Sequence, residues 1–459
     1  MSKKKKRKYS VKELRALEQI NLNAAGIDVG LESLYVAVPT GRDEESVREF
    51  GTYTPDILEM VAWLKQCGVE TVAMESTGVY WIPVYEMLES AGFEVYLVNA
   101  RHVKNVTGRK SDVVDCQWLQ QLHTYGLLQA SFRPAEEIAA LRAVVRQREM
   151  LIQYRAAHIQ HMQKALQQMN LQLTQVLSDI VGVTGMKIMR AIIAGEYDPH
   201  KLAAYRNGNC KHSEADIAKA LTGNYRPEHL FALKQAVALF DFYGQQIAAC
   251  DVQLETMYQQ LEPAAAPVAD LAPQQQKTRR KNQTHFDLRK QLHRLLGIDL
   301  TEVDGFDSLT VQTLVSEIGT DVDAWPTIKH FTSWLALSPN NKITGGKVRG
   351  RHTKKSSNRA NTAFRLAAQS VARSDSAVGA FYRRKRAHLG PAKAIVATAH
   401  KLARIFYVIL QRREPYQDPG ASYYEEQYRQ RAIRNLQRKA AILGLQLEPV
   451  HSTTQTGVS

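Results

Sequence analysis

The chain has 459 residues, 44% of them hydrophobic, and its 60 Lys and Arg against 45 Asp and Glu give a net charge of +15. Such a length suits two or three domains, and such an apolar fraction is ordinary for a globular protein. With no run of eighteen apolar residues and no apolar stretch after the basic run Lys3–Lys8, neither a membrane span nor a secretory leader is expected.

The four cysteines are widely spaced, and none belongs to a CxxC pair. This spacing argues against a zinc site and against a disulfide framework. A reducing cytoplasm is therefore the expected location.

The positive charge is concentrated in one part of the chain. No Asp or Glu occurs between Ala324 and Ser374, and the basic residues of this stretch are Lys329, Lys342, Lys347, Arg349, Arg351, Lys354, Lys355, Arg359, Arg365 and Arg373. A long field of one sign suits phosphate contacts, so a nucleic acid is favoured over a membrane as partner. The alternative is a basic protein with no polyanionic partner.

In chain order, residues 1–20 open with the lysine run and are expected to form a flexible basic arm. Residues 21–130 alternate strand and helix patterns, which predicts a layered α/β domain. Its expected elements are two strands within 22–38, a helix over 57–66, a strand over 71–74, a helix over 82–90, a strand over 94–98 and a helix over 111–122.

Residues 131–262 are expected to form a coiled-coil or otherwise helical region. One long helix is predicted over 134–174, because apolar side chains recur every three or four positions, interrupted only at Arg148 and Arg155. This seam is typical of a coiled coil, and the alternative is a helix packed within its own domain. A second long helix over 227–261 is a candidate antiparallel partner.

The rest of the chain is expected to contain one further domain. The segments are a linker rich in Ala, Pro and Gln over 263–285, a mostly helical C-terminal domain over 286–415 and a polar tail over 416–459. Helices are predicted over 360–371 and 393–410, and one in the tail over 423–444.

Four acidic side chains stand at the ends of elements in the first domain. Asp28 lies on an apolar strand in Ala-Gly-Ile-Asp-Val-Gly, and Glu75 ends a strand in Val-Ala-Met-Glu-Ser-Thr-Gly. Asp112 and Asp115 are three residues apart near the start of a helix, so they share one face of it. An ionised carboxylate on a buried strand is costly unless a cation meets it.

Carboxylate oxygens of this kind select Mg²⁺ or Mn²⁺. Such a cation polarises a phosphoryl oxygen, and two would clamp the attacking and leaving oxygens of an in-line displacement. Taken singly, Asp112 suits the positive end of a helix, Asp115 a solvated helix face and Glu75 an ion pair with an arginine. Asp28 is the hardest to explain in this way, and the four together predict a metal site.

The motifs around these acids resemble those of a known family. Gly-Ile-Asp-Val-Gly at 26–30, Met-Glu-Ser-Thr-Gly-Val-Tyr-Trp at 74–81 and Arg-Lys-Ser-Asp-Val-Val-Asp at 109–115 are similar to the motifs of the DEDD transposases of insertion sequences, relatives of the Piv DNA invertase. The resemblance extends to the C-terminal domain. It implies a RuvC-like (RNase H-like) α/β domain whose catalytic, metal-binding tetrad is Asp28, Glu75, Asp112 and Asp115.

The family also implies a hydroxyl nucleophile in the C-terminal domain. Family members have a Ser-Gly pair whose serine attacks DNA and forms a covalent phosphodiester, which conserves bond energy for strand exchange. This chain has Thr344 before two glycines, so Thr344 is the candidate nucleophile and Ser338 the fallback. Threonine keeps the hydroxyl but adds a stiffening methyl group. The alternative is a turn residue.

Basic residues after Thr344 are expected to hold phosphates near the reacting strand. They are Lys347, Arg349, Arg351, Lys354, Lys355 and Arg359, and the alternative is a solvated basic loop. Residues 302–319 are similar to a helix-hairpin-helix-like segment of the family. Asp307 stands there in place of the usual second glycine, so a plain helix pair explains this segment at least equally well.

The resemblance implies a transposase that cuts and rejoins donor and target DNA with Mg²⁺-assisted chemistry, guided by a noncoding RNA. Synapsis of two DNA sites implies a homo-oligomer, a dimer or tetramer, assembled through the coiled coil and associated with the nucleoid of a bacterial cytoplasm. Two alternatives stay open. One is a RuvC-like nuclease that uses water, and the other is a nucleic-acid-binding protein that has lost catalysis.

Overall fold

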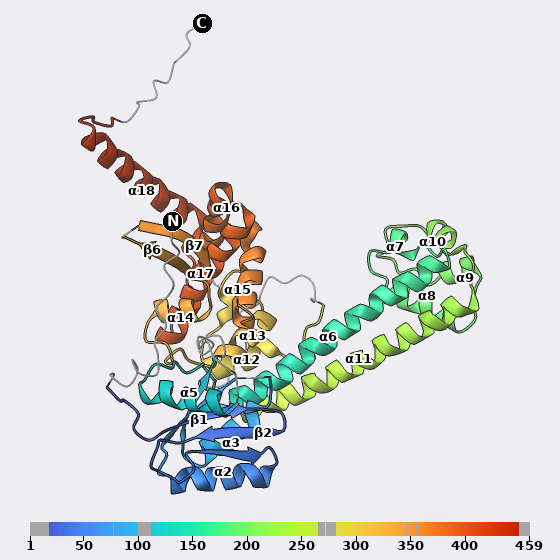
Figure 1. Ribbon diagram of the computed structural model, residues 1–459. Coiled ribbons are helices and arrows are strands. Elements are labelled where there is room, and N and C mark those ends of the chain that lie inside the picture. Colours follow the sequence, from blue (N-terminus) through green and yellow to red (C-terminus); the bar gives the residue numbers. More distant parts are fainter. Residues whose placement is uncertain are drawn as a thin grey trace, which may run out of the picture. The chain divides into compact units, whose positions relative to one another are not determined.

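The computed structural model describes residues 18–76, 78–99, 112–264, 271, 281–345, 347–353 and 356–448 (Figure 1). The chain divides into two compact units, residues 1–133 and residues 134–459. Each unit has a hydrophobic core of its own. The expected basic arm and linker fall largely outside the described residues.

The first unit contains a five-stranded mixed sheet in the order β3-β2-β1-β4-β5. β1 pairs antiparallel with β2 and parallel with β4; β2 pairs antiparallel with β3, and β4 pairs parallel with β5. The strands are β1 (Ala24–Val29), β2 (Ser33–Ala37), β3 (Val47–Gly51), β4 (Thr71–Glu75) and β5 (Glu94–Val98). A mixed sheet with helices confirms the α/β prediction at this level.

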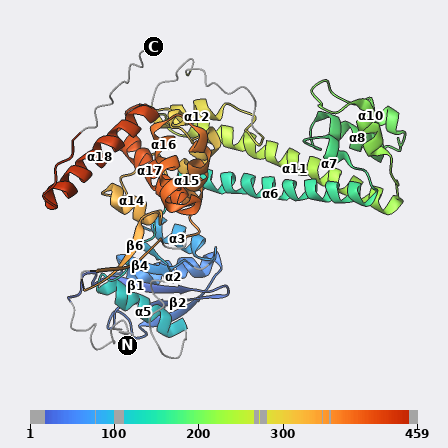
Figure 2. The same cartoon turned by 90° about the horizontal axis from the view of Figure 1, so that it is seen from above.

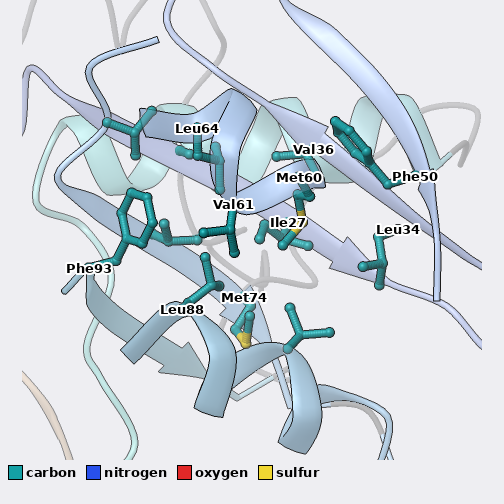
Figure 3. Packing of buried hydrophobic residues seen from close by; sticks show 14 of the residues in the cluster. Ile27, Leu34, Val36, Phe50, Met60, Val61, Leu64, Met74, Leu88 and Phe93 are labelled. Carbon is teal, nitrogen blue, oxygen red and sulfur yellow. The ribbon is translucent and has the colours of Figure 1, made fainter. Parts of the chain in front are cut away.

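Alternating side chains give the sheet two faces. Ile27 of β1 and Met74 of β4 point into the hydrophobic core, where they meet helices α2 (Thr54–Gln66) and α3 (Trp81–Ser90) (Figure 3). Helix α5 (Asp112–Thr124) packs on β1, β2 and β4. It covers the opposite face, which carries the side chains that alternate with the core positions.

Two long antiparallel helices dominate the start of the second unit. α6 (Glu136–Gln168) and α11 (Pro227–Gln260) lie side by side along most of their length (Figures 1 and 2). Arg148 of α6 and Asp251 of α11 form an ion pair with 2.5 Å between Nε and Oδ1, and both side chains are at most 3% exposed. The seam predicted on α6 is therefore packed against a helix of the same chain.

Helix α6 is shorter than the predicted 134–174. It ends at Gln168, and Asn170 takes a left-handed conformation with φ 52°. The amide of Leu171 then donates to the carbonyl of Leu166, which closes the helix end. Four short helices follow and pack on the tips of α6 and α11: α7 (Leu173–Val176), α8 (Val183–Ile193), α9 (Pro199–Ala203) and α10 (Glu214–Leu221).

The rest of the second unit is mostly helical, as predicted. Its helices are α12 (Leu288–Leu296), η1 (Leu300–Glu302), α13 (Ser308–Ile318), α14 (Ile328–Trp334), α15 (Arg359–Ser370), η2 (Val371–Arg373), α16 (Ala377–Leu389), α17 (Pro391–Arg412) and α18 (Gly420–Ile442). A hairpin of β6 (Pro339–Thr344) and β7 (Lys347–Thr353) interrupts them. The segment around β7, for which a solvated loop was the alternative, is a strand.

Helix α17 is the one helix among the described residues that could cross a membrane by length and composition alone. Half of its apolar window is buried inside the second unit. Leu402 and Phe406 are fully buried there, as in the core helix of a folded domain.

Candidate functional site

Asp28 and Glu75 lie at the same end of neighbouring strands. Ile27 of β1 is in register with Met74 of β4, and the two strands run parallel, so Asp28 and Glu75 follow at equivalent positions. Because Ile27 and Met74 point into the core, both carboxylates point to the opposite face, where α5 lies. Both side chains are half-buried.

Helix α5 brings the other two acids to this face. Its buried side chains Cys116, Leu119 and His123 recur at helical spacing, and Asp112 and Asp115 extend the same stripe toward the N-terminus. His123 Nε2 lies 2.8 Å from Thr71 Oγ1 at the far end of β4, which fixes the helix along the strand. The stripe therefore runs toward the strand ends that carry Asp28 and Glu75.

Gly26 allows this close packing. A Cβ atom at Gly26 would lie 2.4 Å from the carbonyl oxygen of Cys116 and 2.3 Å from the amide nitrogen of Gln120. Only glycine lets the backbone of α5 approach β1 so closely. Sequence reasoning saw Gly26 only as part of the motif and missed this role, which the helical spacing of Cys116 and Gln120 alone could not reveal.

The four acids interact electrostatically. The pKa of Asp28 is raised from 3.8 to about 6, first by burial and then by the charges of Asp112, Asp115 and Glu75. The buried thiol of Cys116 also has its pKa raised to about 12, mainly by burial and in part by the charge of Asp28. This face of the sheet thus concentrates negative charge in a partly desolvated place.

This donor set fits a hard divalent cation. Carboxylate oxygens alone make up the set, and a bound cation would offset both the burial and the carboxylate repulsion that raise the pKa of Asp28. Within the described part of the chain, however, no three His, Cys, Asp or Glu side chains stand close enough together to hold an ion as they are. Asp112 is exposed at the first position of α5, so ion binding requires the acids to draw together.

Thr344 belongs to the second unit. It is the last residue of β6 and is exposed at the tip of the hairpin, in register with Lys347 of β7. Gly345 has φ 57°, the left-handed conformation that a two-residue hairpin turn requires. Ser338, the fallback, is half-buried just before β6, and its hydroxyl donates to Thr332 Oγ1 at 2.9 Å.

The basic residues expected around Thr344 have different surroundings. Arg349 is exposed on β7, whereas Arg359 at the start of α15 forms an ion pair with Glu149 of α6. Only the strand positions of Lys347 and Arg351 are described, and Lys354 and Lys355 lie outside the described residues.

Asp307 has a structural role. Its carboxylate accepts a hydrogen bond from the amide of Thr310 at 2.8 Å and thereby caps α13. Gly305, with φ 95°, lies where a Cβ atom would meet the carbonyl of Ala367 at 2.7 Å. Helix capping and helix packing therefore account for Asp307 and Gly305, and a phosphate-binding role is not needed to explain them.

Comparison with protein families gives two matches. Residues 25–171 match a transposase family described as the DEDD transposases of IS110, and residues 297–383 match the transposase IS116/IS110/IS902 family. The first match contains the four acids and the second contains Thr344. A search of curated proteins finds no match.

Together the two matches cover about half of the chain and identify a DNA transposase of an insertion sequence. The chain belongs to the IS110 family of DEDD transposases.

Proposed function

We propose that the chain cuts and rejoins strands of donor and target DNA, with Thr344 as nucleophile and Mg²⁺ or Mn²⁺ held by Asp28, Glu75, Asp112 and Asp115. The observation that carries this proposal is that the charges of Asp112, Asp115 and Glu75 all contribute to the raised pKa of Asp28, on the face of the sheet that α5 covers. In this proposal the first unit is a RuvC-like domain, with which its mixed sheet is compatible.

The proposed reaction begins with attack of Thr344 Oγ1 on a DNA phosphorus atom. An O–P bond to threonine forms, the bond between phosphorus and the 3′ oxygen breaks, the hydroxyl proton passes to water, and the leaving oxygen takes up a proton. A 3′ hydroxyl of another strand then attacks the phosphothreonine and releases Thr344. A divalent cation, when bound, supplies charge that stabilises the leaving oxygen.

The acids and Thr344 belong to different units of the chain. Reaction therefore requires the tetrad of one unit and the hydroxyl of the other to meet at one phosphate, within one chain or between two chains. Exposed Arg349 beside the hairpin tip is suited to hold a neighbouring phosphate. Guidance by a noncoding RNA is part of the proposal, and the net charge of +15 is compatible with an RNA partner.

A homo-oligomer is also proposed, because synapsis brings two DNA sites together. The helices α6 and α11 carry partly exposed aromatic side chains, such as Tyr154 at 49% and Phe242 at 50% exposure. Sedimentation of the full chain with and without DNA measures the number of copies.

A covalent adduct tests the nucleophile. The full chain is incubated with Mn²⁺, the element's noncoding RNA and a DNA substrate nicked so that the cut product diffuses away, and adducts are separated on a denaturing gel. We expect an adduct with the wild type and with Thr344→Ser, and none with Thr344→Ala or Asp28→Asn. Asp28→Asn keeps the shape of the side chain and removes the charge.

Each other outcome assigns a different function. Cutting without an adduct identifies a nuclease that uses water. An adduct that survives in Thr344→Ala but is lost in Ser338→Ala makes Ser338 the nucleophile. Binding of DNA without cutting, with every divalent cation and RNA supplied, identifies a binding protein that has lost catalysis.

A further inference from the structure

A cavity of about 710 Å³ lies in the second unit, between α14 and α17. One wall is a single stripe of α17, in which His400, Arg404, Tyr407 and Gln411 recur at helical spacing. The opposite wall includes Ile328, Lys329 and Thr332 of α14, and Ser338 lies at the edge. This volume is in the range of cavities that bind small ligands or parts of larger ones.

The lining of this cavity is positively charged. It contains Lys329, Arg404 and His400 and no carboxylate. Within the part of the chain that the structure describes, neither Lys329 nor Arg404 forms an ion pair. Burial, followed by the charge of Arg404, lowers the pKa of His400, which agrees with a positive field in the cavity. Two cations in an open cavity whose lining contains no acid favour an anion.

The hydroxyl groups of the lining are occupied inside the protein. Ser338 donates to Thr332, Thr332 donates to the carbonyl of Ile328 at 3.0 Å, and Tyr407 Oη donates to the carbonyl of Trp325 at 2.8 Å. The remaining hydrogen-bond donors of the lining include the side chains of Lys329, Arg404 and Gln411. A ligand rich in acceptors, such as a phosphodiester, matches them.

The position of the cavity relates it to the hairpin. Ser338 immediately precedes β6, and β6 ends at Thr344. Six residues of extended strand span roughly 20 Å, at about 3.3 Å per residue. The cavity is therefore separate from the proposed reacting hydroxyl. A DNA strand that passes both would place a phosphate several nucleotides away from the one at Thr344.

We propose that the cavity between α14 and α17 binds a backbone phosphate of the DNA strand that Thr344 attacks, through Lys329 and Arg404. This inference rests on the proposed function for the identity of the strand. Lys329 lies inside the residues that match a transposase family and Arg404 lies beyond them, and the match itself assigns a role to neither.

Binding of DNA by single-charge variants tests the proposal. Fluorescence anisotropy of a labelled DNA duplex is measured with the full chain at several salt concentrations. Lys329→Gln and Arg404→Gln are each expected to weaken binding about three- to tenfold and to reduce the slope of log K against log salt by about 0.7–0.9, the change for one lost phosphate contact. Arg404→Lys is expected to keep most of the slope.

Arg412→Gln is the matched control. Arg412 is an exposed cation on the same helix but outside the cavity lining, so its replacement removes the same charge from the protein. Equal weakening by Arg404→Gln, Lys329→Gln and Arg412→Gln would overturn the site and leave only a general effect of net charge. Unchanged thermal unfolding of each variant establishes that folding is intact.

Two further measurements, adduct formation and RNA binding, distinguish a failure of this proposal from a failure of the proposed function. If no covalent adduct forms with the wild type but the cavity variants still weaken DNA binding selectively, the cavity stands and the nucleophile assignment fails. RNA of the same sequence is measured alongside. Weakening with DNA, whether or not RNA shares it, supports the proposal, and selective weakening with RNA alone contradicts it.

Discussion

Gly26 controls how closely helix α5 approaches the sheet. The backbone of Cys116 and Gln120 occupies the space that a side chain at Gly26 would need. Because α5 carries Asp112 and Asp115, the same glycine also controls how near these acids come to Asp28. One hydrogen atom in place of a methyl group thus links the packing of the first unit to its candidate site.

Gly26→Ala is therefore expected to destabilise the first unit by about 1–3 kcal/mol, the usual cost of overpacking a tight contact. Urea unfolding measures the change. Gly208→Ala is the control, because a Cβ atom at Gly208 would meet nothing within 4 Å. A Gly26→Ala protein as stable as the control would show that α5 does not lie against β1 as described.

His123 makes the first unit sensitive to acid. Burial lowers its pKa from 6.5 to about 4, and its ring is 1% exposed beside Thr71. Because the folded protein lowers the pKa of His123, burying the neutral ring costs no proton above pH 6.5. As the pH falls from 6.5 toward 4, the unfolded chain takes up a proton that the folded protein does not, and the free energy of unfolding decreases. The shift corresponds to about 3 kcal/mol.

His123→Phe keeps a ring of similar size and cannot take up a proton. We expect the variant to lose less stability than the wild type between about pH 7 and pH 4, as measured by the urea midpoint at each pH. His388→Gln, which replaces an exposed histidine of the second unit, is measured in parallel as the control. Identical pH profiles for the wild type and His123→Phe would contradict the role of His123.

At the scale of elements, the pair α6 and α11 is held by a buried ion pair. Arg148 pairs with Asp251, and Asp251 also accepts a hydrogen bond from the amide of His285 at 3.2 Å. Arg148 interrupts the apolar seam of α6 at a position that faces α11. A buried charge is costly without its partner, so this pair ties the register of the two helices to one alignment.

Replacing only one residue of the Arg148–Asp251 pair should lower the free energy of unfolding much more than replacing both. Arg148→Met is expected to cost about 3–5 kcal/mol, because Asp251 stays buried without the guanidinium that balances its charge. The double variant Arg148→Met, Asp251→Leu is expected to recover most of that loss. A double-mutant cycle from urea unfolding measures the coupling. Additive losses in the double variant would show that the two side chains do not interact.

Elements with strong periodicity are predictable from the sequence, and weaker ones are not. The strands that carry Asp28 and Glu75 follow apolar runs; β4 covers Thr71–Glu75 where the pattern predicts 71–74, and β1 lies within the apolar stretch 22–38, in which two strands are predicted without separate bounds. β3 escapes prediction because its Val-Arg-Glu-Phe-Gly sequence at the edge of the sheet buries only Phe50. β7 is rich in Lys, Arg and Gly, which are poor strand formers, and its pairing with β6 comes from the turn at Gly345.

The site could be predicted in part. The four acids are recognisable from their motifs, but nothing in the spacing shows that α5 crosses β1 at Gly26. The partners of Arg148 and Arg359 lie more than a hundred residues away in the chain, at Asp251 and Glu149. Such contacts depend on how elements pack, which a local sequence pattern does not determine.

At the scale of the whole molecule, the chain combines an acidic face in its first unit with cationic groups in its second. The charges of three other carboxylates act on Asp28, whereas Lys329 and Arg404 line a cavity whose lining has no acid. The charges suit a cation in one unit and a nucleic-acid backbone in the other. Both are needed by the reaction proposed for this chain.

The binding of Mn²⁺ to the full chain tests most directly whether the four acids form one cation site. Titration calorimetry, with and without DNA, compares the wild type with Asp28→Asn, Glu75→Gln and Asp115→Asn, and Glu59→Gln, an exposed acid on α2, serves as control. We predict that each of the three variants weakens Mn²⁺ binding at least about tenfold while the control leaves it unchanged. Mn²⁺ binding that is the same in Asp28→Asn and Glu75→Gln as in the wild type would contradict the account.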